Sequence, residues 1–516
     1  MALKALQRLN VLNFHIERLR GSPLGAIAAV FSKSPIDAPC LVGKMLCAMR
    51  HRAQDAAAVA WGNTLESAKS PDLLTASSPS QHTAIGYGFT QILPEDKPQP
   101  LQAEGGWLCL DGRVVADGML AGAEKAARLL APKLVPGQFP SIHRDVDGAY
   151  VLCWCADSSL FVTRDELGLK PLFMGSRGDL FTVASDRKAL WAVGINETKP
   201  FPPGGCLKAS EGALALESSR DQLEISEAPR REKVDAEELL RLLVESVSIQ
   251  TAGVGKVATG FSGGLDSTVI AKIAKDAGVD SLLVTLGVGR TPEMSQAELA
   301  ARIIGLPIIT REFSMDDVAA CLDHVLWLIE EPNLMKTSVA MAISWTAQIA
   351  AETGRHVMLL GQGSDELFGG YKRYARIMGE SGADAASEAI SQSVREAHEV
   401  NYQRDEQAVS ALRSELRLPF ATRKIIEFAS RVPLVMKVKS PSDDFRKWIL
   451  RDAAVKLGIP TIIAMRPKKA IHHASGVEKA IREIAKRHGL SASNYLQQRL
   501  VTIKSESRDR PNVASY

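Results

Sequence analysis

The stretch Lys256-Val-Ala-Thr-Gly-Phe-Ser-Gly-Gly-Leu-Asp-Ser267 decides the fold of the second half of the chain. Residues 256–261 form a largely apolar run typical of a buried strand, and the pattern predicts a helix over 268–276. Glycines between strand and helix let the backbone approach a ligand closely, and amides at a helix start point toward an anion. Ser262 and Ser267 add hydroxyl donors, so the loop is a candidate anion cradle.

An acid within this cradle points to a divalent cation. Asp266 fits an anion site if a cation bridges its carboxylate to phosphates. The lysine of a Walker A loop is absent, since no Gly-x-x-x-x-Gly-Lys-Ser/Thr pattern accompanies the stretch. Gly-Gly before Asp-Ser also makes ordinary turns, but the position between strand and helix favours a ligand-binding loop.

A second loop, Gly361-Gln-Gly-Ser-Asp-Glu-Leu-Phe-Gly-Gly-Tyr371, repeats this logic after a predicted strand over 356–360. Its acids, Asp365 and Glu366, would also be stabilised by a helix dipole alone, but that explanation leaves the glycines on both sides unexplained. The ends of nearby parallel strands face one crevice, so the two loops are expected to meet.

Strands and helices alternate around both loops. Further strands are predicted over 281–286 and 307–310, separated by helices of the length found in βαβ units. This predicts an α/β domain with a parallel sheet, whose chemistry lies at the carboxyl ends of the strands.

The first half of the chain has a different texture. Short β runs punctuated by Gly, Pro, Asp and Asn extend to about residue 216, with helical stretches near 41–49 and 122–130, which predicts an α+β sandwich. The predicted divisions are an N-terminal extension 1–22, a first domain 23–216, a linker 217–235, a second domain 236–504 and a tail 505–516.

Composition limits the classes of function. The chain of 516 residues carries 62 Lys+Arg and 59 Asp+Glu, a formal charge of +3, which argues against nucleic acid or an acidic membrane as the main partner. Seven cysteines without a CxxC pair suit a reducing compartment, so a cytoplasmic location is expected. The Cys153-x-Cys155 pair would share one face of a strand, and packing is a better explanation for it than metal binding. No apolar run reaches membrane-spanning length.

The first 22 residues show leucines at roughly helical spacing among basic residues. They lack the continuous apolar core of a secretory signal and carry only Ser22 as a hydroxylated residue. We interpret them as an added amphipathic helix, or as the result of a translation start assigned too early. Both interpretations are preferred to a targeting peptide.

Both loops resemble those of the asparagine synthetase family, whose C-terminal domain is a PP-loop ATP pyrophosphatase of HUP-like fold. The likeness covers almost the whole chain after residue 23. Further matching segments are 164–172, 184–190 and 202–205 in the first half, and 331–332, 445–450 and 466–469 in the second. The resemblance implies that the first half is like a class II glutamine amidotransferase of Ntn-hydrolase type.

The resemblance also implies a reaction and its cofactors, ATP and Mg²⁺. ATP would turn an acceptor carboxylate into an acyl-adenylate, releasing pyrophosphate, and an amine would then displace AMP. Asp266 and Asp365 match the carboxylates that hold magnesium, and Lys468 falls where the family has a mobile lysine, with Lys469 as the alternative. The residues implied to contact the nucleotide or pyrophosphate are Gly260, Ser262, Gly263, Gly264, Asp266, Ser267, Leu286, Leu360 and Gly361.

One departure concerns the general base. Much of the family has Gly-Glu-Gly where this chain has Gln362, and a glutamine cannot accept a proton in catalysis. Glu366 is the candidate substitute. Glu330, Glu331, Asn333 and Lys336 are candidate contacts to the acceptor acid.

A larger departure is the missing nucleophile. The family begins its amidotransferase domain with a cysteine, and Leu24 occupies that register here. Leucine has no thiol, and it does not stand at the chain start. The glutamine pocket that the resemblance implies also departs from the family. The family's His-Arg-Gly is His51-Arg-Ala53 here, and its Asn-Gly-Glu is Asp111-Gly-Arg113. We therefore expect no glutamine hydrolysis by this chain.

Three functions remain open. The first is an asparagine synthetase that uses free ammonia or ammonia from a separate glutaminase, acting on aspartate. The second is a ligase for another acid and amine, like the β-lactam synthetases, which also lack the cysteine. The third is a nucleotide-binding pseudoenzyme or regulatory subunit, which the retained Asp266 and Asp365 disfavour. The resemblance also implies a homodimer.

Overall fold

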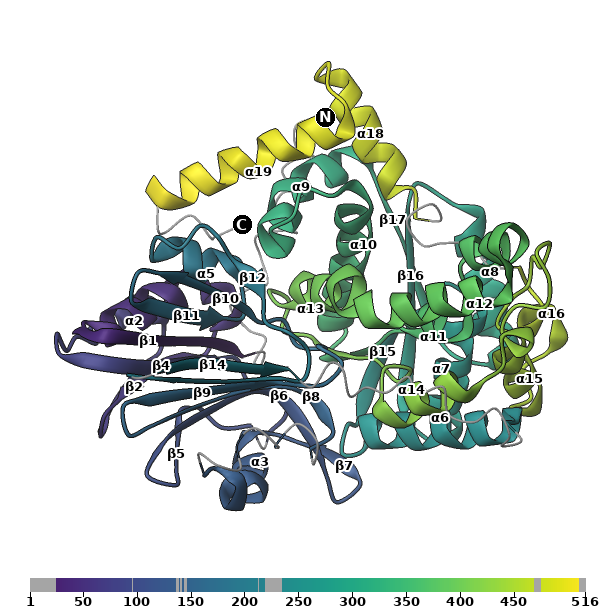
Figure 1. Ribbon diagram of the computed structural model, residues 1–516. Coiled ribbons are helices and arrows are strands. Elements are labelled where there is room, and N and C mark those ends of the chain that lie inside the picture. Colours follow the sequence, from purple (N-terminus) through teal and green to yellow (C-terminus); the bar gives the residue numbers. More distant parts are fainter. Residues whose placement is uncertain are drawn as a thin grey trace.

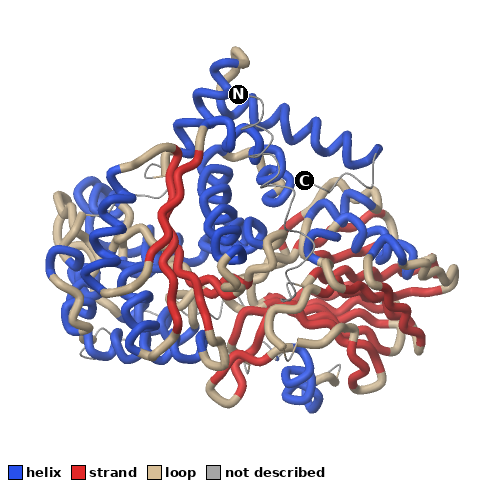
Figure 2. The backbone as a smooth tube through the Cα atoms, turned by 180° about the vertical axis from the view of Figure 1, so that it is seen from behind, coloured by secondary structure: helices blue, strands red, loops and turns tan. Residues whose placement is uncertain are grey.

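The computed structural model describes residues 25–94, 96–135, 139, 142, 146–211, 213–218, 234–467 and 475–509. The expectations for the N-terminal extension, Leu24, Lys468 and Lys469 lie outside these ranges, as does most of the predicted linker. Within them the chain forms a β-rich half and an α/β half side by side (Figure 1). Strands crowd one half and helices dominate the other (Figure 2).

The first half is two antiparallel sheets packed face to face, with helices on the outside. One sheet has the order β12-β10-β11-β1-β4-β2-β3, and the other has the order β14-β13-β9-β8-β6-β5, with β7 beside β6. The strands of the first sheet are β1 (Ala26–Ile36), β2 (Ala56–Trp61), β3 (Thr64–Ala68), β4 (Gln81–Phe89), β10 (Phe173–Arg177), β11 (Leu180–Ala184) and β12 (Lys199–Pro200). Those of the second are β5 (Leu101–Ala103), β6 (Gly106–Ala116), β7 (Met119–Ala121), β8 (Gly148–Ala156), β9 (Ser159–Arg164), β13 (Gly205–Ser210) and β14 (Ala213–Ser218).

Both sheets are buried on two faces. Cys153 and Cys155 lie on the face of β8 that packs against the other sheet, which confirms their predicted shared face and packing role. Helices α2 (Ala38–Ala48) and α5 (Arg187–Ala192) cover the outer face of the first sheet, and α3 (Ala123–Leu130) covers that of the second. The predicted α+β sandwich is confirmed.

The second half is built on a five-stranded parallel sheet of order β17-β16-β15-β18-β19. Its strands are β15 (Lys256–Gly260), β16 (Asp280–Val288), β17 (Ile308–Phe313), β18 (Val357–Leu359) and β19 (Glu415–Arg417). One face is covered by α6 (Ala236–Thr251), α7 (Leu265–Asp276), α8 (Pro292–Ile304), α14 (Arg423–Arg431), α15 (Trp448–Lys456) and α16 (Thr461–Ala464). The other is covered by α9 (Met315–Ile329), α10 (Leu334–Glu352), α13 (Gln403–Val409) and α18 (Val477–Arg487).

The predicted α/β fold with a parallel sheet is confirmed, with two differences. The sequence predicted that helices dominate after residue 360, but β19 adds a fifth strand there, because three residues between helices suffice to pair with β18. The long helix α19 (Ala492–Asp509) extends into the predicted tail and reaches toward the first half (Figure 1). None of the helices in the described ranges has the length and apolarity that a membrane span requires.

Charged contacts tie the two halves together. Arg113 on β6 pairs with Glu415 on β19 at 2.9 Å, and Arg413 pairs with Asp55 at 2.9 Å. The Lys504 ammonium of α19 lies 3.7 Å from the ring centroid of Trp191 on α5. The first half is therefore in continuous contact with the sheet and helices of the second.

Candidate active site

Neighbouring parallel strands bring the two glycine-rich loops together. β15 pairs with β18, and Thr259 lies opposite Leu359, so both strands end at one edge of the sheet. A Cβ atom on Gly361 would lie 2.9 Å from the Cβ of Asp266, a separation that real side chains do not show. Glycine is therefore needed here, since it lets the second loop rest directly on the first.

A cavity of about 830 Å³ opens at this edge of the sheet. Every residue that the resemblance assigns to nucleotide or pyrophosphate contact lines it, except Gly263. Gly263 has φ of +65°, and a Cβ there would lie 2.7 Å from the Cα of Ala297 on α8. Gly263 turns the loop against α8, and its predicted contact with the ligand stays a prediction.

The first loop has the local geometry of an anion cradle. Helix α7 begins at Leu265 directly after Gly264, so its first amides lie at the end of the loop. The Ser262 hydroxyl accepts a hydrogen bond from the Gly264 amide and lies 3.3 Å from the Ser267 hydroxyl. Amides and hydroxyls thus converge on one point, as an oxyanion site requires.

Lys447 joins the acids of both loops. Its ammonium lies 2.7 Å from both carboxylate oxygens of Asp266 and 2.6 Å from Asp365. Burial alone would lower the pKa of Lys447, but the two carboxylates outweigh it and the pKa is raised. Asp266 also accepts a 2.9 Å hydrogen bond from Ser364, so one compact cation already fits between the acids.

The backbone at Lys447 is unusual. Arg446 and Lys447 have φ of 54° and 53°, a left-handed conformation that side chains rarely adopt. Arg446 donates to the Gly370 carbonyl at 3.0 Å, which fixes the turn against the second loop. Lys447 was missed as a site residue, although the matching segment 445–450 contains it and gave the available signal.

The position predicted for the mobile lysine stays untested. Lys468 and Lys469 lie outside the described residues, which resume at Ser475. Arg466 and Pro467, just before them, line the cavity, and Arg466 donates to the Gly263 carbonyl at 3.2 Å. The segment therefore leaves from the wall of the cavity.

Glu366 lies in a hydrogen-bonded cluster at the far side of the cavity. Its side chain is buried and accepts hydrogen bonds from the Tyr371 hydroxyl and, at 2.7 Å, from the Asn401 amide. Burial and the negative charge of Glu366 raise the pKa of Tyr371 far above its usual value, so the phenol stays protonated. Arg373 stacks beside it, with its guanidinium carbon 4.9 Å from the centroid of the Tyr371 ring. Gln362 lines the same cavity.

The structure places the predicted acceptor contacts near residue 330 outside the lining of this cavity. None of Glu330, Glu331, Asn333 and Lys336 lines this cavity. Glu330 adopts a left-handed conformation at the end of α9, and its carboxylate accepts hydrogen bonds from the amides of Arg187 (2.8 Å) and Lys188 (2.7 Å) in the first half. Lys336 forms an ion pair with Glu331 instead.

A compact charge cluster lies where the sequence predicted the glutamine pocket. Arg52 holds Asp186 through two 3.0 Å hydrogen bonds, and Lys188 lies 3.1 Å from the same carboxylate. Burial favours the neutral carboxyl, but Arg52 and Lys188 keep the pKa of Asp186 well below its usual value. Burial, together with the charge of Lys188, lowers the pKa of His51 to about 3. Arg52 is thereby committed to Asp186.

Comparison with known proteins fits this architecture. The asparagine synthase family model matches residues 238–396 and 380–505, which is more than half of the chain. The chain belongs to the asparagine synthase family. The family match and the relatives support an ATP-dependent carbon–nitrogen ligase. A glutamine amidotransferase family model matches residues 90–192 in its first half.

Individual relatives agree. This chain is 31% identical over 392 residues to a putative glutamine-hydrolyzing asparagine synthetase 1 of Methanocaldococcus jannaschii, and the match covers 67% of this chain and 72% of that protein. Asparagine synthetase B of Escherichia coli is 26% identical over 358 residues, covering 65% and 63%, and the Homo sapiens asparagine synthetase is 27% identical over 355 residues, covering 62% of each. The chain thus spans less than two thirds of the length of the last two.

Proposed function

We propose that this chain activates an aspartate-like carboxylic acid as an acyl-adenylate and joins it to ammonia without glutaminase activity of its own. The observation that carries the proposal is the meeting of Asp266 and Asp365 around one cation, beside the loop of amides and hydroxyls. A carboxylate resists attack by an amine because its oxygen is a poor leaving group. Transfer of AMP to that oxygen, with release of pyrophosphate, removes the obstacle.

The donor set between the loops fits Mg²⁺. Mg²⁺ in nucleotide sites is held by one or two carboxylates, with phosphates and water completing the octahedron. Asp266 and Asp365 supply that number, and the Lys447 ammonium already occupies the space between them. A bound Mg²⁺ would neutralise charge on the phosphates. Lys447, released from the carboxylates, would then bind the pyrophosphate.

Glu366 is proposed as the base that Gln362 cannot be. The ionised carboxylate is supported by hydrogen bonds from Tyr371 and Asn401, and it shares the cavity with the nucleotide loops. Ammonia attacks the acyl carbon, the bond to AMP breaks, and the proton from nitrogen passes to Glu366. Lys468, if it reaches the cavity, would stabilise the negative charge that develops on the acyl phosphate.

Ammonia is the proposed nitrogen source because side chains of the predicted glutamine pocket are paired with one another and are not free to bind glutamine. Arg52 is held by Asp186. The space beside Gly25 is also filled, since a Cβ on Gly25 would lie 2.2 Å from the Tyr87 hydroxyl oxygen. A separate glutaminase is the alternative supplier. Glutamate release from glutamine by the pure chain would refute this part of the proposal.

An acceptor screen tests the reaction. With ATP, Mg²⁺, aspartate and ammonium, the full chain should form AMP, pyrophosphate and asparagine in equal amounts, and glutamine should not replace ammonium. Pyrophosphate with a different acid only would favour a ligase like the β-lactam synthetases, and none with any acid would refute the proposal.

A matched pair of variants tests the site. Asp266→Asn should abolish AMP formation. Asp276→Asn, at the other end of α7 in an exposed ion pair with Lys272, should leave it unchanged. Equal activity of the two variants would remove Asp266 from the site.

A further inference from the structure

A π-helical turn forms part of the wall of the ATP cleft. Helix α12 (Lys372–Ala397) continues into residues His398–Tyr402, where a backbone amide donates to the carbonyl five residues back. Val400 and Asn401 of this turn line the cleft. π-helical turns are rare, and they occur frequently at functional sites. This one contacts the ligase site on one side and the first half of the chain on the other.

On the side of the cleft, the turn holds the second glycine-rich loop. The Asn401 amide donates to Glu366 at 2.7 Å. The Tyr402 side chain packs on the same loop, since a Cβ on Gly363 would lie 3.0 Å from the Tyr402 hydroxyl oxygen. Asn401 and Tyr402 are deeply buried, so neither side chain can shift without displacing its neighbours. The position of the Glu366 carboxylate therefore depends on the position of the turn.

On the opposite side, three consecutive residues of the first half contact the turn and the helix after it. Gly168 has φ of +63°, and a Cβ there would lie 2.9 Å from the Cβ of His398, the first residue of the turn. Leu169 packs against the hydrophobic cluster to which the turn and α13 contribute. Lys170 forms a buried ion pair with Glu406 on α13. Both ends of the turn are thus held by the first half.

The loop that makes these contacts, residues 165–170, has a fixed conformation of its own. The buried Asp165 carboxylate accepts hydrogen bonds from three backbone amides of the loop at 2.9–3.2 Å. The buried Arg164 guanidinium donates to the carbonyls of Gly168 and Lys170 at 2.8 and 2.7 Å. A buried charge with several backbone partners rigidifies the segment around it. The first half therefore presents a rigid surface to the turn.

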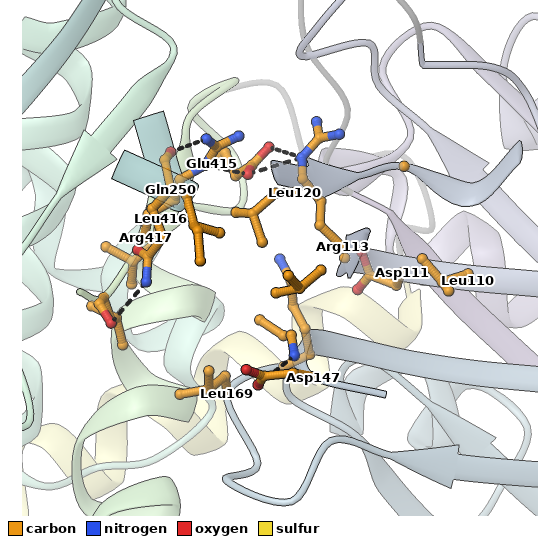
Figure 3. Close-up of a pocket in the computed structure, with 18 of the residues that line it drawn as sticks. Leu110, Asp111, Arg113, Leu120, Asp147, Leu169, Gln250, Glu415, Leu416 and Arg417 are labelled. Atoms are coloured by element: carbon orange, nitrogen blue, oxygen red, sulfur yellow. Dashed lines mark hydrogen bonds and ion pairs between the residues drawn. The ribbon is translucent and has the colours of Figure 1, made fainter. Parts of the chain in front are cut away.

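The same interface continues beyond α13. Leu169 also borders a cavity between the two halves, and on the wall of that cavity Arg113 of β6 pairs with Glu415 of β19 (Figure 3). Glu415 follows α13 in the chain. The first half thus contacts this segment of the ligase half before α13, within it and after it, which leaves the turn little freedom to shift.

We infer that the first half positions the base of the ligase reaction: loop 165–170 supports the π-helical turn, and Asn401 of the turn holds Glu366. This positioning role rests on the function proposed for Glu366. In the step that needs the base, the bond between nitrogen and the acyl carbon forms, the bond to AMP breaks, and the proton passes from nitrogen to the carboxylate. The preceding adenylation needs no base, because the acid is already ionised at neutral pH.

Two reactions of the full chain separate positioning from folding. Exchange of labelled pyrophosphate into ATP, in the presence of aspartate and Mg²⁺, measures adenylation alone. Formation of asparagine from ammonium measures adenylation together with the step that needs the base. A change that only destabilises the protein lowers both rates, whereas displacement of Glu366 lowers the second rate and leaves the first.

Gly168→Ala places a methyl group against His398. It should lower asparagine formation at least about tenfold, because a misplacement of about 1 Å can cost about 100-fold, and pyrophosphate exchange should be unchanged. Gly178→Ala is the matched control. Its φ of +60° imposes the same backbone strain, but among the described residues nothing beyond its chain neighbours lies within 4 Å of its Cβ position. It should change neither rate.

Two further variants decide the matter if Gly168→Ala does not fold. Asn401→Leu, of similar size, removes the donor to Glu366. Leu169→Ala loosens the contact with the turn without backbone strain, and Leu41→Ala, at a half-buried leucine within the first half, is its control. Asn401→Leu and Leu169→Ala should both lose asparagine formation and keep exchange, and Leu41→Ala should keep both.

The outcomes separate this positioning role from the proposed function. Absence of pyrophosphate exchange in the wild type would contradict the proposed function itself. With exchange present in the wild type, normal asparagine formation in Asn401→Leu and Leu169→Ala would overturn only the positioning role. An equal loss of both rates in these two variants would overturn it as well, because the contacts would then serve stability alone.

Discussion

The ammonium of Lys447 bridges the carboxylates of Asp266 and Asp365. Replacing Lys447 by methionine should make the stability of the protein depend on a divalent cation bound between these carboxylates. The side chain of Lys447 is 3% exposed, and its ammonium is shared by Asp266 and Asp365 at 2.6–2.7 Å. Methionine keeps an unbranched apolar side chain, one heavy atom shorter than that of lysine, but removes the charge, so the two carboxylates are left facing each other. Lys447→Met should therefore be destabilised when divalent cations are absent.

The expected size follows from burial. Removing one partner of a buried ion pair costs about 3–5 kcal/mol. The two carboxylates keep about a fifth of their side-chain surface exposed, so the lower end, about 3 kcal/mol, applies. In a domain of this size that corresponds to about 6 °C in melting temperature. A divalent cation at 100 times its Kd would restore about 2.7 kcal/mol.

Differential scanning fluorimetry in EDTA and in saturating Mg²⁺ measures both effects. Lys447→Met should melt lower than wild type in EDTA and should gain more from Mg²⁺, because no ammonium has to be displaced. Lys456→Met, at the end of the helix α15 that begins directly after Lys447, lies in an exposed pair with Glu237; it is the matched control and should change neither value. Equal Mg²⁺ responses in Lys447→Met and wild type would refute the bridging role.

Three other variants test separate parts of the molecule. Gly361→Ala, whose new methyl group would meet Asp266, should lower pyrophosphate release at least about tenfold, whereas Gly255→Ala, with open space around its Cβ position, should not. Glu366→Gln should lower kcat by about 100-fold with the KM for ATP unchanged, and an unchanged kcat would exclude it as the base. The pKa of Glu415 is lowered to about 2 from 4.5, because Arg113 and Arg417 outweigh its burial. Its contribution, about 3 kcal/mol, is present above pH 4.5 and lost as the pH falls toward 2. The free energy of unfolding of Glu415→Gln, measured in urea as a function of pH, should therefore not show this loss between pH 4.5 and pH 2.

The parts of the site that lie on one strand and its following loop were predictable from sequence. Ser262, Asp266 and Asp365 follow buried strands, and parallel pairing then brings the loops together without further information. Local pattern is sufficient here, because backbone conformation and strand order fix where these side chains lie.

Residues brought in from distant segments were not predictable. Lys447 lies 181 positions from the carboxylate that it contacts, and its left-handed backbone has no signature in a Phe-Arg-Lys-Trp run. Glu330 was expected at the acceptor, but it turns away because the amides at the start of α5 provide better partners. β19 was missed because Glu415 and Arg417 look like surface residues until Arg113, 302 positions away, pairs with Glu415, which also holds Arg417.

The hydrogen bonds of the Glu330 carboxylate affect whether the two domains can evolve separately. Helix α5 begins at Arg187 without a capping side chain of its own, and the ligase half supplies the missing acceptors. Excision of the first half would leave Glu330 without these amides, and excision of the second would leave α5 uncapped. Two domains that complete each other's backbone hydrogen bonds are inherited as one folding unit. The first domain is then retained for as long as its neighbour is needed, whatever chemistry it performs itself.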